Sequence, residues 1–272
     1  MKVNMKIIKS AEIQVKITEL KKKNSNSFSS NYFLNPLNDE IQILENENAI
    51  LFLTKDKDIY RTYFAYNDLN SFENLLLKLP KDIKISLEIL SKKEVEKELF
   101  DCLNKYLLFE TAYERYRCKC TNLRIFQKIN INNIQTAKEE DLEQIDLLLN
   151  ETFNHHTSHL PTKEELMKLI NNQNIIISKT DDKITSLIVY KKVGNNINFD
   201  QLINKDNQPL KMMYILDCLY SILKEQEYNE VFLWVDTLYN KDVVKLHKLY
   251  GYKSDLLKDY YFINNKLQKA KK

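Results

Sequence analysis

The stretch VFLWVDTLYNKDVVKLHKLYGY, residues 231–252, contains the most regular pattern in the chain. Its five leading apolar residues, Val231–Val235, predict a strand that is buried on both faces. Lys241–Tyr250 then spaces its apolar side chains along one face of a helix. Gly251 follows directly, at the position where helices commonly end in a left-handed residue. The stretch therefore predicts a buried strand, a loop and an amphipathic helix that ends at a glycine.

The rest of the second half has equally clear turn and helix signals. Asp181-Asp182 separates two apolar runs and predicts a hairpin, and Pro161-Thr162 predicts a helix start. The expected strands are residues 134–137, 174–178, 184–191 and 197–203, with one or two more within 253–263. The expected helices are residues 139–153, 162–170 and 210–226. This half is thus predicted to alternate between strands and helices.

The first half has a similar but shorter pattern. Residues 49–54 and 60–66 predict a hairpin, and Asp68 caps a predicted helix over residues 68–79. A strand at 83–90 and a helix at 92–108 follow. The segment before residue 49 is ambiguous, and its polar stretch at 24–31 predicts a loop.

Composition narrows the class of protein. Among the 272 residues, 41 Lys and Arg against 38 Asp and Glu leave a net charge of +3, without the basic excess of a nucleic-acid binder. Four cysteines in a chain of this length do not form a disulfide framework. No apolar stretch reaches the ~18 residues that cross a bilayer, and the amino-terminal segment lacks the pattern of a signal peptide. We expect a cytoplasmic protein that binds neither nucleic acid nor membrane.

The order of the predicted elements and the spacing within residues 231–252 resemble the GNAT (N-acetyltransferase) superfamily. Members follow the fifth strand with Asn, a small apolar residue three positions on, Leu-Tyr, and Gly-Phe five residues after that Leu. Asn240, Val243, Leu246-His247 and Gly251-Tyr252 stand in this register. The resemblance implies a mixed α/β acyltransferase domain over residues 128–272. Residues 1–127 are similar to the later part of such a domain and suggest a degenerate second copy, hence a tandem arrangement.

The resemblance also implies a cofactor, acetyl-CoA or another acyl-CoA. In GNAT proteins two parallel strands separate at their carboxyl ends, and the pantetheine arm pairs with the first of them. Leu202 and Ile203 would supply the backbone groups here, and the resemblance implies that Asn240 and Val243 also contact the cofactor. The diphosphate would lie at the amino end of the following helix, which carries unpaired N–H groups.

The loop before that helix departs from the family pattern, because it contains no glycine. In one register Gln208 begins the motif, and Lys211 and Met213 occupy the small-residue positions. In the other, set by the apolar pattern of the helix, Leu210 and Met212 occupy them. Glycine normally lets a phosphate approach the backbone closely, whereas Lys211 could add a charged contact.

Acyl transfer to an amine requires a base for the amine and an acid for the departing thiolate. The resemblance assigns the acid to His247, whose ordinary pKa of about 6.5 suits proton donation at neutral pH, with Tyr250 as a second candidate. His247 equally fits a purely packing role. Asp200, on the strand that borders the gap, is the candidate base, although strand alternation equally allows it to face solvent.

Three histidines, His155, His156 and His159, lie in the loop between the first two predicted helices of this domain. No carboxylate or cysteine lies among them, so we predict no metal site. In GNAT proteins this loop borders the acceptor, which makes the three histidines candidate substrate contacts. An exposed loop without a role is the alternative.

We therefore expect an enzyme that transfers an acetyl or short acyl group to a primary amine of a small molecule or peptide by direct attack. Two alternatives stay open. One is a non-catalytic GNAT-like module that has lost its cofactor, and the other is a tandem aminoacyl transferase. A homodimer is also left open.

Overall fold

The structure is a computed structural model that describes residues 5–32, 41–126, 134–205 and 209–264. The chain forms two compact units. Unit 1 comprises Met1–Ala112 and Lys258–Lys272, and unit 2 comprises Tyr113–Leu257. The division between the units thus falls between Ala112 and Tyr113, whereas the sequence was divided after residue 127.

Unit 2 is built on a mixed sheet in the order β7-β12-β11-β10-β9-β8. Only β11 and β12 run parallel, and the other neighbours are antiparallel. Its strands are β7 (Leu108–Lys119, from Tyr113 onward), β8 (Ile134–Thr136), β9 (Ile175–Thr180), β10 (Lys183–Val193), β11 (Asn196–Asn204) and β12 (Glu230–Asp236). Its helices are α4 (Leu142–Thr152), α5 (Lys163–Asn171), α6 (Pro209–Glu225) and α7 (Lys241–Leu249), and short 3-10 turns lie at Cys120–Asn122 and Glu139–Asp141.

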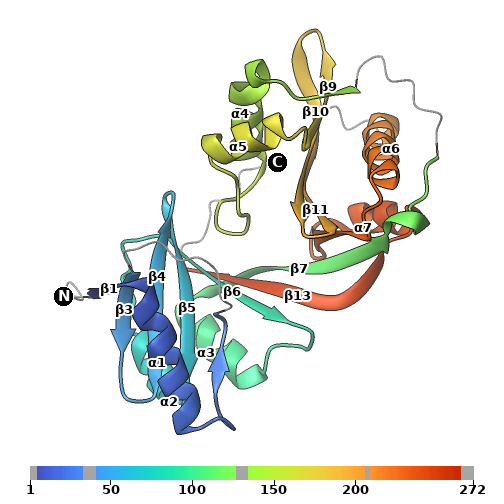
Figure 1. Cartoon of the computed structure of the whole chain (residues 1–272). Helices are drawn as coiled ribbons and strands as arrows, with labels where there is room; N and C mark the ends of the chain where they lie inside the picture. The colour runs from blue at the N-terminus through green and yellow to red at the C-terminus, as the bar shows by residue number, and fades with distance from the viewer. Residues whose placement is uncertain (1–4, 33–40, 127–133, 206–208, 265–272) are drawn as a thin grey trace. The chain divides into compact units, whose positions relative to one another are not determined.

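Alternation along the strands of unit 2 buries both faces of the sheet. Ile175 and Ile177 of β9 belong to one apolar cluster, with residues of α4 and α5, whereas Ile176 belongs to another, with residues of α6. Figure 1 shows α4 and α5 on one side of β9–β11 and α6 on the other. The hairpin between β9 and β10 turns at Asp181 and Asp182, both with positive φ (48° and 60°), as the predicted two-residue turn requires.

The end of α7 has the predicted glycine geometry. Gly251 has φ +104°, and the Tyr252 amide donates to the His247 carbonyl at 3.2 Å. A Cβ on Gly251 would lie 3.0 Å from the backbone oxygen of Asn122. A side chain at this position would therefore be strained and crowded as well.

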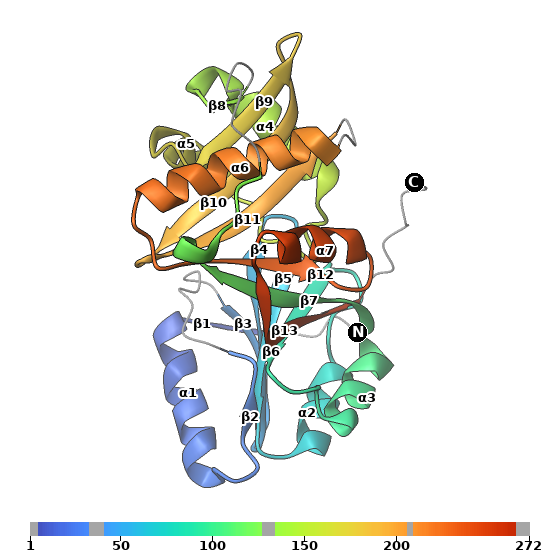
Figure 2. The ribbon, with the colours of Figure 1, turned by 90° about the vertical axis from the view of Figure 1, so that its right-hand side faces the viewer.

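Unit 1 has a sheet in the order β1-β3-β4-β5-β6-β13, of which it contains the part of β13 from Lys258 onward. The strands are β1 (Lys6–Ile8), β2 (Ser29–Ser30), β3 (Ile41–Glu45), β4 (Ala49–Asp56), β5 (Ile59–Tyr66), β6 (Ile85–Ser91) and β13 (Lys253–Ile263). The helices are α1 (Ser10–Lys23), α2 (Leu69–Leu76) and α3 (Lys97–Tyr106). Figure 2 shows α1 on one side of this sheet, and α2 and α3 on the other.

The two units repeat one order of elements. Unit 1 runs β3-β4-β5-α2-β6-α3, and unit 2 runs β9-β10-β11-α6-β12-α7. Among the described residues each unit contains a single parallel strand pair, β5 with β6 and β11 with β12. In each unit the strand beside the second member of that pair comes from a distant part of the chain, β13 beside β6 and β7 beside β12. The predicted mixed α/β class is confirmed.

Several local expectations differ from the structure. The helix predicted from residue 92 begins at Lys97, and residues 10–23, which the sequence left ambiguous, form α1. The polar stretch 24–31, predicted as a loop, contains the short strand β2. No helix in the described ranges is long and apolar enough to span a membrane.

Candidate functional site

The parallel strands β11 and β12 pair only along their first halves. Their register runs from Asn196 opposite Glu230 to Phe199 opposite Leu233 and then stops. β11 continues to Asn204 and β12 to Asp236. On that edge, residues 200–203 pair with no strand in the described part of the chain. We call the place where pairing ends the parting point of unit 2, and it exposes backbone donors and acceptors that a ligand can use.

A bulge lies at this parting point. Gln201 pairs with Val189 and Phe199 pairs with Tyr190, so Asp200 is the extra residue of β11. Its carboxylate lies 2.5 Å from Nζ of Lys191, and only 18% of its side chain is exposed. Asp200 therefore lies at the site, as an ion-paired and largely buried carboxylate.

The predicted cofactor residues of β11 lie just beyond the bulge. Leu202 is half-buried and packs against the apolar cluster under α6, whereas Ile203 is buried in the opposite cluster. Their side chains are therefore used for packing on the two faces of the sheet. Their backbone groups on the β12 side remain without a strand partner among the described residues.

The amino end of α6 follows β11 after a gap of four residues, so it lies within short reach of the parting point. Pro209 has no N–H, and the amide of Leu210 has no carbonyl within the helix to bond. Leu210 is exposed, while Met212 packs against the apolar cluster. The carbonyl of Met213 accepts a hydrogen bond from the Tyr250 hydroxyl. Gln208 lies outside the described residues.

His247 lies in the interior beside the parting point. Its ring packs edge-on against Phe199, the last residue of β11 that pairs with β12, with 5.7 Å between ring centroids. Burial lowers the pKa of His247 to about 4, and its Nδ1 has no hydrogen-bond partner. The imidazole is therefore neutral at pH 7, because desolvation disfavours its charged form. Proton donation from an imidazolium, on which the sequence argument relied, does not fit this pKa.

Tyr250 is part of the core under α6. Its ring packs against the rings of Tyr220 and Phe126, with 4.9 and 5.0 Å between the ring centroids. Burial, with the nearby Asp217 charge, raises the pKa of Tyr250 far above its ordinary value. The hydroxyl thus remains protonated and holds the first turns of α6 to the end of α7.

The carboxyl end of β12 is closed by Asp236, which sequence reasoning did not single out. Its Oδ1 accepts hydrogen bonds from the amides of Leu238 and Tyr239, at 2.9 and 3.1 Å. This turn delivers Asn240, exposed at the start of α7, and Val243, half-buried on its inner side. An acidic residue directly after a buried strand was the signal that could have identified Asp236.

The histidine loop lies at the same end of the sheet. Tyr113 of β7 lies opposite Asp236 of β12 in the sheet. The Tyr113 hydroxyl donates a hydrogen bond to Oγ1 of Thr157 at 3.3 Å. His155 bonds Asn150 through Nε2 at 2.8 Å, His156 is buried beside Asn154, and His159 is exposed. In the described residues no three potential metal ligands gather. The loop therefore borders the parting end with its histidines directed to different neighbours.

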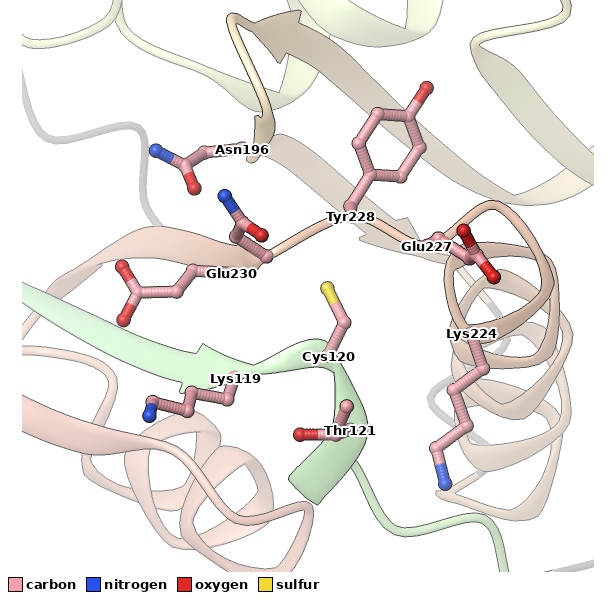
Figure 3. A pocket seen from close by; sticks show the side chains of 9 residues that line it. Lys119, Cys120, Thr121, Asn196, Lys224, Glu227, Tyr228 and Glu230 are labelled. Carbon is pink, nitrogen blue, oxygen red and sulfur yellow. The ribbon is translucent and has the colours of Figure 1, made fainter.

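A hollow of about 900 Å³ lies at the opposite end of β11 and β12, where Asn196 and Glu230 begin these strands. Figure 3 shows Cys120 and Lys224 among the side chains that line it. Burial is the main cause that raises the pKa of the Cys120 thiol to about 11, and the Cys118 and Glu230 charges contribute less. The thiol is thus a poor nucleophile at neutral pH, and we do not place the chemistry there.

Comparison with known proteins gives the fold. No protein-family model and no curated protein matches the sequence. A GCN5-related N-acetyltransferase from Sphaerobacter thermophilus superposes with a TM-score of 0.57 at 8% identity, over 79% of this chain and 76% of that one. A GNAT-family acetyltransferase from Colwellia psychrerythraea gives 0.51 at 13% identity, over 96% and 100%. A GCN5-related N-acetyltransferase from Kribbella flavida gives 0.52 at 10%, over 84% and 91%.

The chain has the GNAT fold. The resemblance that residues 231–252 carry is thereby confirmed at the level of the fold. At 8–13% identity these likenesses speak for the architecture alone.

Proposed function

We propose that unit 2 is an N-acyltransferase that moves an acetyl or short acyl group from an acyl-CoA to a primary amine. One observation supports this most directly. The parallel strands β11 and β12 separate after Phe199 and Leu233, and β11 is left with a free backbone edge and is followed, four residues on, by the amino end of α6. This combination provides hydrogen-bonding groups for an extended amide chain and a positive helix end for a phosphate.

The residues present fit an acyl-CoA. Leu202 and Ile203 would pair with the amide groups of the pantetheine arm through their backbone. The amino end of α6, with the Leu210 amide and the Lys211 charge, would hold the diphosphate. Leu210 is exposed and Met212 packs inward, so these positions do not require glycine to keep the helix end accessible. Asn240 and Val243 would border the same molecule from α7. A bound acyl-CoA supplies a thioester whose carbonyl carbon is the electrophile.

The chain's own groups constrain how protons move. Asp200 is held beside the parting point by Lys191 and is the candidate base that takes a proton from the acceptor's ammonium group, directly or through water, so that the neutral amine can attack. His247 is neutral at physiological pH, so its ring can only donate a hydrogen bond from a neutral N–H or pack against its neighbours. We therefore assign the protonation of the leaving thiolate to solvent or to the amine's own proton rather than to His247 or Tyr250.

The acceptor is proposed to approach past the loop that carries His155, His156 and His159. This loop is fixed at the parting end by Tyr113 and Thr157. An amine of a small molecule or of a peptide end is the expected acceptor class.

The test is binding and turnover with the intact chain. Acetyl-CoA at 100 times its Kd should raise the free energy of unfolding by about 2.7 kcal/mol, seen as a higher melting temperature. Release of the CoA thiol is then measured over a panel of primary amines, with Asp200→Asn as the variant and Asp101→Asn, exposed on α3 of unit 1, as its control. Asp200→Asn should lower kcat with little change in acetyl-CoA affinity, and Asp101→Asn should change neither.

The outcomes separate the alternatives. Stabilisation together with thiol release supports the transferase. Stabilisation without release with any amine favours the non-catalytic binding module, and failure of acetyl-CoA to stabilise the chain rejects the proposal. Transfer of the amino acid from an aminoacyl-tRNA to the amine, with free tRNA and no CoA thiol released, would favour the aminoacyl transferase.

A further inference from the structure

Unit 1 has a parting point of its own. β5 and β6 are parallel, and their register covers only Tyr60 opposite Ile85 through Thr62 opposite Leu87. β5 then continues to Tyr66 and β6 to Ser91. By the order of the elements, this is the place in unit 1 that corresponds to the parting point of unit 2.

The free edge of β5 at this point is occupied by the chain itself. One edge of β5 pairs with β4 along its whole length, from Ile59 to Tyr66. β2 also pairs with β5, with Ser29 opposite Tyr66 and Ser30 opposite Ala65. Because a strand has only two edges, β2 must lie on the edge that faces β6. It occupies the position that an extended ligand takes when it adds to a sheet edge.

Asn31 continues this contact into the angle between the two strands. Its backbone N–H donates to the Phe64 carbonyl at 3.3 Å, and its Oδ1 accepts from the Phe64 amide at 2.6 Å. Its Nδ2 donates to the carbonyls of Thr62 at 3.2 Å and Glu88 at 2.8 Å. Thr62 is the last residue of β5 that pairs with β6, and Glu88 is the first residue of β6 beyond that pairing. The buried side chain of Asn31 thus satisfies both strands where they separate.

The residues on either side hold the segment in place. The Ser30 hydroxyl donates to the Phe64 carbonyl at 2.8 Å and accepts from the Tyr32 amide at 3.1 Å. The Tyr32 ring packs edge-on against Phe52 and Tyr63, at 5.3 and 5.6 Å. Occupation of the edge is therefore supported by side chains as well as by backbone pairing.

The helix that follows β5 is also closed to an anion. α2 begins at Leu69, and Oδ2 of Asp68 accepts from the Ser71 amide at 2.7 Å. The hydrogen bonds from Ser71 lower the pKa of Asp68, so the cap is a carboxylate at neutral pH. A negative charge already satisfies the helix end where a diphosphate would have to bind.

We propose that residues 29–31 are a built-in occupant of the parting point of unit 1, so unit 1 takes no acyl-CoA and the chain binds one molecule, in unit 2. The number of molecules bound rests on the proposed function of unit 2. The self-occupied edge does not, because it follows from contacts within unit 1 alone.

Two measurements test the inference on the wild-type chain. Isothermal titration with acetyl-CoA should give one molecule per chain, and two molecules would overturn the proposal. Hydrogen exchange should show the Phe64 amide protected without any ligand, since Asn31 accepts its hydrogen. An unprotected Phe64 amide would also overturn it.

Asn31→Ala removes three side-chain hydrogen bonds and should speed exchange of the Phe64 amide at least tenfold. Asn46→Ala is the control, because Asn46 also makes side-chain bonds in unit 1 but lies at the β3–β4 turn. The control should leave Phe64 unchanged, and acetyl-CoA affinity should stay within twofold in both variants. Equal Phe64 exchange in the two variants contradicts the proposal. If acetyl-CoA does not bind at all, the function of unit 2 fails, and Phe64 exchange still decides the occupant.

Discussion

The His247 imidazole lies between the rings of Phe199 and Tyr252 and is 3% exposed. Its pKa of about 4 in the folded chain lies below the ordinary 6.5. Between these values the unfolded state binds more protons than the folded one. The stabilising effect of the neutral ring is therefore complete above about pH 6.5 and is lost as the pH falls toward 4.

A matched variant isolates this effect. Between pH 7.5 and 5.0 the free energy of unfolding of the wild type should fall by about 2 kcal/mol more than that of His247→Phe. Phenylalanine keeps an aromatic ring in the site without a titrating group. Urea denaturation at both pH values provides the measurement, and parallel pH dependence in the two proteins would show that His247 titrates normally.

The two glycines of the chain have different structural demands. Gly251→Ala should lower the free energy of unfolding by about 3 kcal/mol or more, because its φ of +104° is strained for alanine and its Cβ would meet the Asn122 carbonyl. Gly194→Ala is the control, with φ +59° and open space around the Cβ. It should cost about 1 kcal/mol. Thermal unfolding of both variants decides the point, and equal losses would contradict the crowding at Gly251.

For single residues, the sequence predicted where a residue lies in its element better than it predicted its protonation state or ion-pair partner. Gly251 follows the helix as expected, because the requirement for a left-handed residue is local. The pKa of His247 could not be predicted, since the rings packed against it come from Phe199 of β11 and from Tyr252, directly before β13. The ion pair of Asp200 with Lys191 was equally hidden, because it depends on a bulge between two strands.

At the scale of elements, the amino end of α6 is the part of the site that a charge can test. Leu210→Glu places a carboxylate at an exposed position in the first turn, and it should stabilise the helix by about 0.3–1 kcal/mol. The same charge should repel the diphosphate and raise the Kd for acetyl-CoA roughly tenfold, or about 1.4 kcal/mol. Leu210→Gln is the neutral control. Titration calorimetry that finds both variants binding alike would place the diphosphate elsewhere.

Elements with strong periodicity were predicted closely, and elements without it were missed. The apolar run of β12 and the capped helix α2 lie where the pattern placed them. β2 was assigned to a loop because Ser29 and Ser30 carry no apolar alternation. Its conformation is determined by the free edge of β5, which is a tertiary partner rather than a local preference.

The core of unit 1 depends on β13, which follows unit 2 in the chain. A chain that ends after Leu257 lacks Tyr260 and Phe262, two buried rings of the unit 1 core. The loss of each ring should lower the free energy of unfolding by about 3–5 kcal/mol. In addition, β6 would lose its pairing with β13. We expect unit 1 of this truncated chain to unfold, as hydrogen exchange of β4 and β5 would show. A chain that ends after Asn264 should keep native protection, and native protection in both would contradict the expectation.

The use of β13 by unit 1 also sets an order of events during synthesis. The strand that completes unit 1 leaves the ribosome only after Tyr113–Leu257 has been made. At about 5–20 residues per second the nascent amino-terminal half waits roughly 7–30 s for it. Throughout that interval β6 presents an open edge to other nascent chains. Production of this protein should therefore be sensitive to translation speed and to chaperone supply.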